Sequence, residues 1–151
     1  MIQVSCATYS VNGIKVYDRQ VDSYMSKRTI EALINFSITE LGNDAKIYED
    51  WDFVFTSAWL GQMKGNKLLM ARHAITSYEY KVVFLRVNKC HWDSGIVHEM
   101  MHIILLSKSG DGDLGHKNKK AWDKVKQIEN YMIEKNCPEG YKFSEVPKEL
   151  Y

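Results

Sequence analysis

The sequence predicts an α+β fold, in which a small sheet of three to four strands is combined with helices before and after it. Three observations predict this class: helical spacing of apolar residues from about Met25 to Leu41, strand-like runs between residues 51 and 88, and two helical segments after residue 93. With 151 residues, 45% of them hydrophobic, the chain is long enough for one domain with a real core. We therefore expect a single domain over residues 1–151.

The first helix is predicted by apolar residues that recur at i, i+3 and i+4, which places them on one helical face. Gly42 follows this pattern at a position where helices commonly end. The apolar face consists of Ile30, Leu33, Ile34, Ile38 and Leu41.

Three runs rich in β-branched and aromatic residues follow, and each is typical of a strand. They read WDFVFTSAWL (51–60), KLLMARHAI (67–75) and YKVVFLRVN (80–88), and a KGN turn signal separates the first two. A small sheet is the simplest arrangement that accommodates them.

Two helical segments complete the expected elements. The segment 91–110 has Asp93 or Ser94 as a possible N-cap, continues apolar for three turns, and ends near Lys108 and Gly110. After a glycine-rich loop, residues from about Asn118 to Lys135 form an amphipathic helix with lysines on its polar face. Its apolar face carries Ala121, Trp122, Val125, Ile128 and Met132.

The segment Val97 to Leu106 reads VHEMMHIILL and places three polar groups in an otherwise apolar helix. Buried without partners, each would cost about 1 to 3 kcal/mol. Positions four apart lie one turn above each other, so His98 and His102 can present two nitrogens to one point. Glu99 is rotated about 100° from His98, so its carboxylate can reach a water held there without binding the metal itself. This HExxH spacing predicts Zn²⁺ on His98 and His102, with Glu99 as general base.

An open zinc site normally has three protein ligands, so a third must come from elsewhere. His116 is the first candidate, because the glycines of the GDGDLGH segment let the chain turn back toward the motif. Glu129 is the main alternative, since it shares the inward face of the last helix. Asp111 and Asp113 are further alternatives, although a GDGD loop is more often a solvated turn. His73 and His91 have no partner at ligand spacing and are interpreted as structural or surface groups.

The order of these features resembles the SprT/Spartan-like group of small zincin metallopeptidases over roughly Met25 to Lys135. HEMMH (98–102) is the specific part of the match, and GHKNKKAW (115–122) corresponds to the family motif that carries the third histidine ligand. In this chain Lys117 replaces the glycine of that motif, Trp122 comes two residues late, and the C-terminal zinc ribbon of the family is missing. The resemblance implies a zincin-like fold and a zinc peptidase with His98, His102 and His116 as ligands. A metzincin would need glycine and histidine in place of Leu105 and Lys108, whereas a gluzincin with Glu129 as ligand stays open.

The sequence predicts a protein or peptide substrate, which could pair as an extended strand with an exposed edge of KLLMARHAI or YKVVFLRVN. The alternative function is a catalytically inactive, zincin-shaped module for protein interaction or assembly. Nucleic acid is a weakly supported partner, because 20 Lys+Arg against 19 Asp+Glu leave a net charge of +1, although lysines line one face of the last helix.

The location of the protein is predicted from its cysteines and its apolar segments. Cys6, Cys90 and Cys137 are odd in number and far apart, so no disulfide framework is expected and a reducing compartment fits best. The N-terminal segment alternates and turns where a secretion signal would be apolar, and no apolar stretch approaches the ~18 residues of a membrane span. A cytoplasmic protein without a membrane partner is therefore expected.

Overall fold

The computed structural model describes residues 7–21, 25–57, 60–64, 67–72 and 74–142. Cys6 and His73 lie outside the described residues. In chain order, the elements are β1 (Ala7–Val11), β2 (Ile14–Arg19), α1 (Lys27–Leu41), the 3₁₀ helix η1 (Ala45–Tyr48), β3 (Asp52–Thr56), β4 (Leu60–Lys64), β5 (Lys67–Arg72), β6 (Ala74–Ser77), β7 (Val82–Arg86), α2 (Ile96–Ser109) and α3 (Lys119–Asn136).

The main sheet has five strands in the order β1-β2-β3-β7-β6, so the expected α+β class is confirmed. Strands β2, β3 and β7 run parallel, whereas β1 and β6 pair antiparallel at the two edges. Three to four strands were expected. The additional strands come from the alternating N-terminal segment, where Asn12 and Gly13 both have positive φ (50° and 84°) and so form the two-residue turn of a hairpin. Strands β4 and β5 pair separately as a two-stranded sheet.

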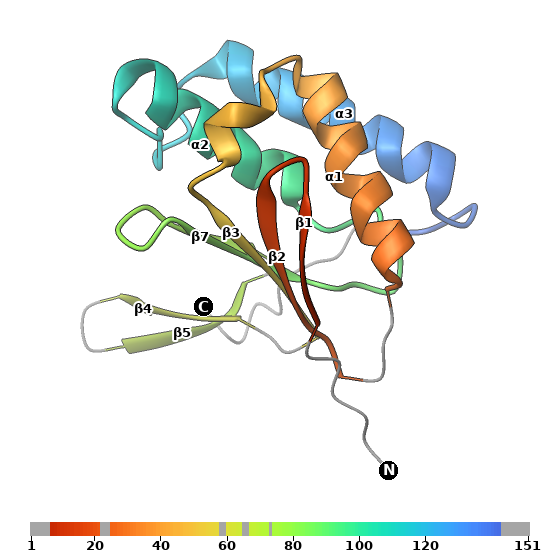
Figure 1. Cartoon of the computed structure of the whole chain (residues 1–151). Helices are drawn as coiled ribbons and strands as arrows, with labels where there is room; N and C mark the ends of the chain where they lie inside the picture. The colour runs from red at the N-terminus through yellow and green to blue at the C-terminus, as the bar shows by residue number, and fades with distance from the viewer. Residues whose placement is uncertain (1–6, 22–24, 58–59, 65–66, 73, 143–151) are drawn as a thin grey trace.

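The three helices cover one face of the five-stranded sheet (Figure 1). Alternate residues of β3 and β7 are buried, as period-two alternation requires when one face packs against helices. The core lies between the helices and the sheet. Its fully buried members include Ile14, Ile30, Leu33, Ile34, Phe53, Phe55, Leu85, Ile96, Met100 and Ile103.

Helix α1 matches its expected extent. Ser26 caps its start by accepting a hydrogen bond from the Thr29 backbone N–H, and Gly42 ends it in the left-handed conformation with φ 71°. The buried face contains Ile30, Leu33 and Ile34, as the apolar spacing predicts.

Helix α2 is buried along most of its length, but its expected N-cap is wrong. Gly95 occupies the cap position with φ 72° and provides no side-chain cap bond. Ser94 precedes the cap position, and its Oγ accepts a long hydrogen bond of 3.4 Å from the Ile96 backbone N–H. The glycine is favoured here because a left-handed residue is needed to turn the chain from β7 into the helix. Gly110 ends the helix, as expected.

A disulfide joins Cys90 to Cys137, which contradicts the expectation of a chain without one. The two cysteines are 47 positions apart, and their Cα atoms lie 5.7 Å apart because Cys90 precedes α2 and Cys137 caps the end of α3. Only the packing of these two helices brings the cysteines together, so their spacing in the sequence gives no signal. Because disulfides persist mainly in oxidising environments, the argument for a reducing compartment loses its support.

None of the described helices combines the length and the apolar composition that crossing a membrane would require.

Candidate metal centre

Three imidazole rings meet at one end of the helical layer. His98 and His102 lie one turn apart on α2, and His116 comes from the loop that joins α2 to α3. The ring centroids are 5.0 Å apart for His98 and His102, 4.9 Å for His98 and His116, and 5.1 Å for His102 and His116. One ring nitrogen from each residue lies within 4.8 Å of the others. The three histidines are therefore close enough to bind one metal ion.

The spacing of the nitrogens is suited to a small tetrahedral ion. The Nε2 atoms of His98 and His116 are 3.1 Å apart. Two nitrogens that each lie 2.0–2.1 Å from zinc in tetrahedral geometry are about 3.3 Å apart. The spacing of this pair of nitrogens is therefore close to the spacing in a tetrahedral zinc site.

His102 is held in the orientation that a ligand needs. Its Nδ1 lies 2.6 Å from the carbonyl oxygen of Gly112. A carbonyl can only accept, so Nδ1 carries the proton and donates, and Nε2 is left with a lone pair facing the other rings. Tyr78 also donates a hydrogen bond to this carbonyl, at 3.3 Å. Gly112 must be glycine, because a Cβ atom at this position would lie 2.1 Å from the Tyr78 hydroxyl.

Burial keeps the two helical histidines neutral near pH 7. Desolvation, together with the neighbouring His102 and His116, lowers the pKa of His98 to about 4. Desolvation also lowers the pKa of His102, against the opposing effect of its hydrogen bond to Gly112. Because a metal binds the neutral imidazole, both rings are in the ligating form at physiological pH.

Asp113 organises the loop that presents His116. Its carboxylate accepts hydrogen bonds from the backbone N–H groups of Lys117 and Asn118, both at 2.8 Å, and from the indole N–H of Trp122 at 2.7 Å. These bonds, with that to Asn118 the largest, lower the pKa of Asp113 to about 2. Asp113 and His116 both have positive φ, 55° and 52°, and the His116 N–H donates to the Asp113 carbonyl. The carboxylate therefore stabilises an unfavourable backbone conformation that turns His116 toward α2.

Trp122, in the first turn of α3, packs against all three imidazoles. Its ring centroid lies 4.7 Å from His98, 4.7 Å from His102 and 4.6 Å from His116. The sequence assigned Trp122 to the apolar face of the last helix. Its contact with the histidines was missed, because the periodicity of one helix does not show what packs against it.

Glu99 lies beside the histidines with its carboxylate buried. The Thr76 hydroxyl on β6 donates a hydrogen bond to its Oε2 atom. Burial raises the pKa of Glu99 to about 7, and the bond from Thr76 opposes that shift. Glu99 and the three histidines line one hollow of about 370 Å³, which we name the metal-facing hollow. Its lining residues are Ala74, Ile75, Thr76, His98, Glu99, His102, Leu114 and His116.

The carboxylates that the sequence offered as alternative third ligands do not join the three histidines. Among the described residues, the metal-competent group contains the three histidines and not Glu129, Asp111 or Asp113. Both Asp113 oxygens are engaged with the loop and Trp122, and Asp111 Oδ1 accepts from the Asp113 N–H. Glu129 is a buried carboxyl on α3, and burial raises its pKa to about 7 with help from the charges of Asp93 and Glu99. His91 lines a separate hollow with Arg86 and Lys89.

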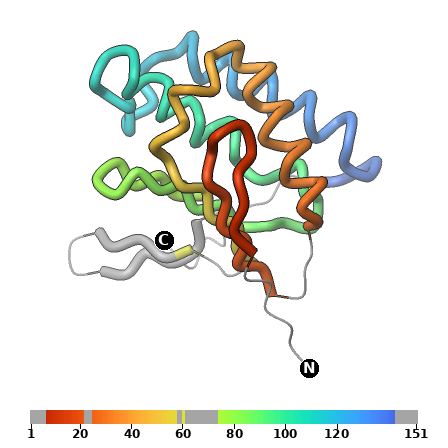
Figure 2. Tube along the Cα trace, in the orientation of Figure 1, coloured from red at the N-terminus to blue at the C-terminus, as the bar shows by residue number. Residues whose placement is uncertain are grey.

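Two residues near the site have no signal in the sequence. Thr76 and Tyr78 lie in and just after β6, 20 or more positions before the histidines, and neither belongs to a recognisable motif. The turn after β6 and the loop after α2 lie at the same end of the molecule in Figure 2, and the bond from Tyr78 to Gly112 joins them.

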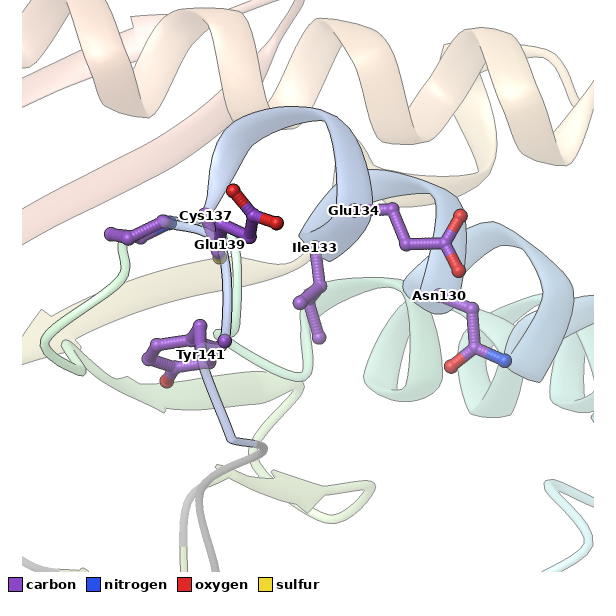
Figure 3. A pocket seen from close by; sticks show the side chains of 8 residues that line it. Asn130, Ile133, Glu134, Cys137, Glu139 and Tyr141 are labelled. Atoms are coloured by element: carbon purple, nitrogen blue, oxygen red, sulfur yellow. The ribbon is translucent and has the colours of Figure 1, made fainter.

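A larger hollow, of about 620 Å³, lies at the C-terminal end of α3 (Figure 3). It is lined by Asn130, Ile133, Glu134, Cys137, Pro138, Glu139, Gly140 and Tyr141. No histidine is present there and the two acidic side chains are exposed, so size alone does not indicate chemistry. The metal-facing hollow is smaller but combines three imidazoles with a buried carboxyl group.

No protein-family model, no curated protein and no solved structure matches this chain. The resemblance to SprT/Spartan-like zincins therefore stays a prediction.

Proposed function

We propose that this chain is a zinc-dependent peptidase, with His98, His102 and His116 as the metal ligands and Glu99 as the general base. The observation that carries the proposal is the convergence of three ring nitrogens within 4.8 Å beside a buried carboxylate. Nitrogen ligands in a tetrahedral arrangement favour zinc over the harder ions Mg²⁺ and Ca²⁺, which prefer oxygen.

Bound zinc would acidify a coordinated water and polarise the carbonyl of the scissile bond. Glu99 then accepts the proton of the attacking water and returns it to the leaving amine. Its burial beside the histidines places the carboxyl where a coordinated water would lie. Thr76 holds the carboxylate by its hydrogen bond and so fixes which oxygen faces the hollow.

The free edge of the sheet supports a peptide substrate. Strand β6 ends the five-stranded sheet, and no other described strand pairs with its outer edge. Residues 74–76 of this strand also line the metal-facing hollow. An extended peptide that adds to this edge would therefore pass the three histidines, with backbone hydrogen bonds to β6. Of the two segments that could supply a free edge, KLLMARHAI does so through Ala74 and Ile75 of β6, whereas β7 lies inside the sheet.

The test combines metal content with hydrolysis of an unfolded, dye-labelled protein. Wild type is expected to bind one zinc and to cleave the substrate. His98→Ala is expected to lose the zinc. Glu99→Gln is expected to keep the zinc but to lose about 10²- to 10⁴-fold in rate, the usual contribution of general base catalysis. Glu134→Gln, which alters an exposed glutamate on α3, is the matched control and should behave like wild type.

Two outcomes would contradict the proposal. Equal activity of Glu99→Gln and wild type would show that Glu99 is not the base. Stoichiometric zinc without cleavage of any unfolded protein would favour the alternative, an inactive interaction module.

A further inference from the structure

Leu114 is a large apolar side chain in an unusual place. It is 67% exposed, whereas most large apolar side chains of the described residues are buried. The other two exposed ones lie in different surroundings: Tyr131 stacks on Phe36, and Tyr80 lies in the turn between β6 and β7. Leu114 instead lines the metal-facing hollow beside His98, Glu99 and His116.

Leu114 also borders a second hollow, of about 410 Å³. Its side chain therefore forms the rim between two adjacent depressions. The second hollow is lined by Tyr78, Leu106, Gly110, Asp111, Gly112, Asp113, Leu114, Gly115 and Lys117.

The exposure of Leu114 is fixed by the loop. Asp113, immediately before it, has positive φ and is anchored through its carboxylate to Lys117, Asn118 and Trp122. His116, two residues later, also has positive φ. Non-glycine residues in this conformation are strained and persist only where surrounding contacts hold them. The hydrogen bonds of Asp113 therefore hold Leu114 in its exposed position.

The part of the metal-facing hollow that β6 contributes is largely apolar. Ala74 and Ile75 of β6 contribute aliphatic side chains. The single acidic group in the lining is Glu99. An aliphatic side chain between Ile75 and Leu114 would remove apolar surface from water on both sides. An acidic side chain against the same apolar surface would lose hydration without gaining a hydrogen-bond partner from Ile75 or Leu114.

We infer that Leu114 and Ile75 form a specificity contact for an aliphatic side chain next to the scissile bond of an extended peptide. This inference rests on the proposed function, because it assumes that the hollow binds a peptide along β6. It assigns a substrate class: unfolded segments with leucine-like residues at the cleavage position.

The experiment uses three small metal-binding probes with the zinc-loaded chain. Acetohydroxamate reports the open metal position alone. The hydroxamates of N-acetyl-leucine and N-acetyl-aspartate add an aliphatic or an acidic side chain to the same group. Dissociation constants are measured by calorimetry for wild type, Leu114→Ser, Leu114→Met and Tyr80→Ser. Tyr80→Ser removes an equally exposed apolar side chain that lines neither hollow.

Wild type is expected to bind the leucine probe roughly tenfold or more tightly than the aspartate probe, the effect of partly burying one aliphatic side chain. Leu114→Ser should lose most of this preference while its affinity for acetohydroxamate stays unchanged. Leu114→Met should retain the preference, and Tyr80→Ser should match wild type.

Equal binding of the leucine and aspartate probes by wild type would overturn the inference and leave the metal site intact. A preference that survives in Leu114→Ser would overturn it as well. Failure of acetohydroxamate to bind zinc-loaded wild type would instead overturn the open metal position of the proposed function, and the inference would fall with it.

Discussion

Asp113 controls the direction of His116 through three hydrogen bonds that an uncharged side chain cannot all accept. Asp113→Asn keeps the size of the side chain but replaces one acceptor oxygen by a donor, so at least one bond to Lys117, Asn118 or Trp122 is lost. We predict that zinc affinity falls about 10- to 100-fold, as is usual when a group that orients a ligand is removed. Competition with a chromophoric chelator measures the change.

Asp123→Asn is the matched control for this prediction. It removes the same charge from the exposed face of α3, where Asp123 pairs with Lys119. Its zinc affinity should equal that of wild type. If Asp113→Asn also bound zinc as tightly as wild type, the loop would be shown to hold His116 without the carboxylate.

Glu129 gives the metal-free protein a pH-dependent stability. Its pKa in the folded chain is about 7, raised from 4.5 mainly by burial. The protonated form is favoured in the folded state. Protonated Glu129 therefore stabilises the folded state fully below about pH 4.5, and this stabilisation is lost as pH rises through 7. Glu129→Gln cannot ionise, so its free energy of unfolding should rise relative to wild type by on the order of 1 to 3 kcal/mol between pH 5 and pH 8.

Urea unfolding of both proteins at the two pH values measures this difference. Glu134→Gln serves as the control, since Glu134 is an exposed residue of the same helix. A constant difference between Glu129→Gln and wild type across this range would mean that the carboxyl at Glu129 is not desolvated in solution.

At the scale of elements, the disulfide fastens the end of α3 to the segment before α2. The disulfide joins residues 47 positions apart, and the loop that it closes reduces the entropy of the unfolded chain. Breaking the disulfide should therefore lower the free energy of unfolding by about 2 to 4 kcal/mol. For a chain of this size, the corresponding fall in melting temperature is about 5 to 15 °C. Calorimetry of Cys90→Ser against the parent, both with Cys6→Ser to prevent alternative pairing, tests the prediction. An unchanged melting temperature would show that the bond contributes no stability.

The three helices could be predicted from sequence because α1 and α3 carry an apolar periodicity, and α2 is an apolar run that ends at Gly110. Leu33 and Ile34, for example, mark the buried face of α1, and Asn118 caps α3 where the pattern begins. Strand pairing could not be predicted in the same way. The place of β6 at the sheet edge depends on β7 folding back beside it, and no residue within Ala74–Ser77 encodes that partner.

The candidate site likewise contains residues that local geometry predicts and residues that depend on tertiary packing. The sequence predicts the group of His98, Glu99 and His102, because a helix fixes the relative directions of their side chains through local geometry alone. The approach of His116 was predictable only as one of several options, since it depends on two left-handed residues and on the anchor at Asp113. Thr76 and Tyr78 reach the site through sheet packing, which leaves no trace in their own spacing.

At the scale of the whole molecule, charge gives little support to a nucleic-acid partner. The net charge is +1, and the lysine face of α3 is partly engaged within the protein. Lys119 pairs with Asp123, and Lys124 donates a hydrogen bond to the Leu41 carbonyl at 3.2 Å. Phosphate binding needs several unengaged cations that release counterions together.

Metal binding should instead be visible in the stability of the whole chain. The three histidines come from α2 and from the loop before α3, so an unfolded chain does not hold them together. A ligand that binds only the folded state stabilises it by about 2.7 kcal/mol at a free concentration 100 times its dissociation constant. For a protein of this size, we predict a rise in melting temperature of about 6 to 10 °C with zinc.

Differential scanning fluorimetry with buffered zinc measures the shift, and magnesium at the same free concentration should produce none, since it prefers oxygen ligands. His116→Ala is the informative variant, because His116 is exposed and its loss leaves the buried core intact. It should melt near the metal-free wild type and respond weakly to zinc. A full zinc response in His116→Ala would mean that the ion is held by His98 and His102 with another group, and the three-histidine centre would be wrong.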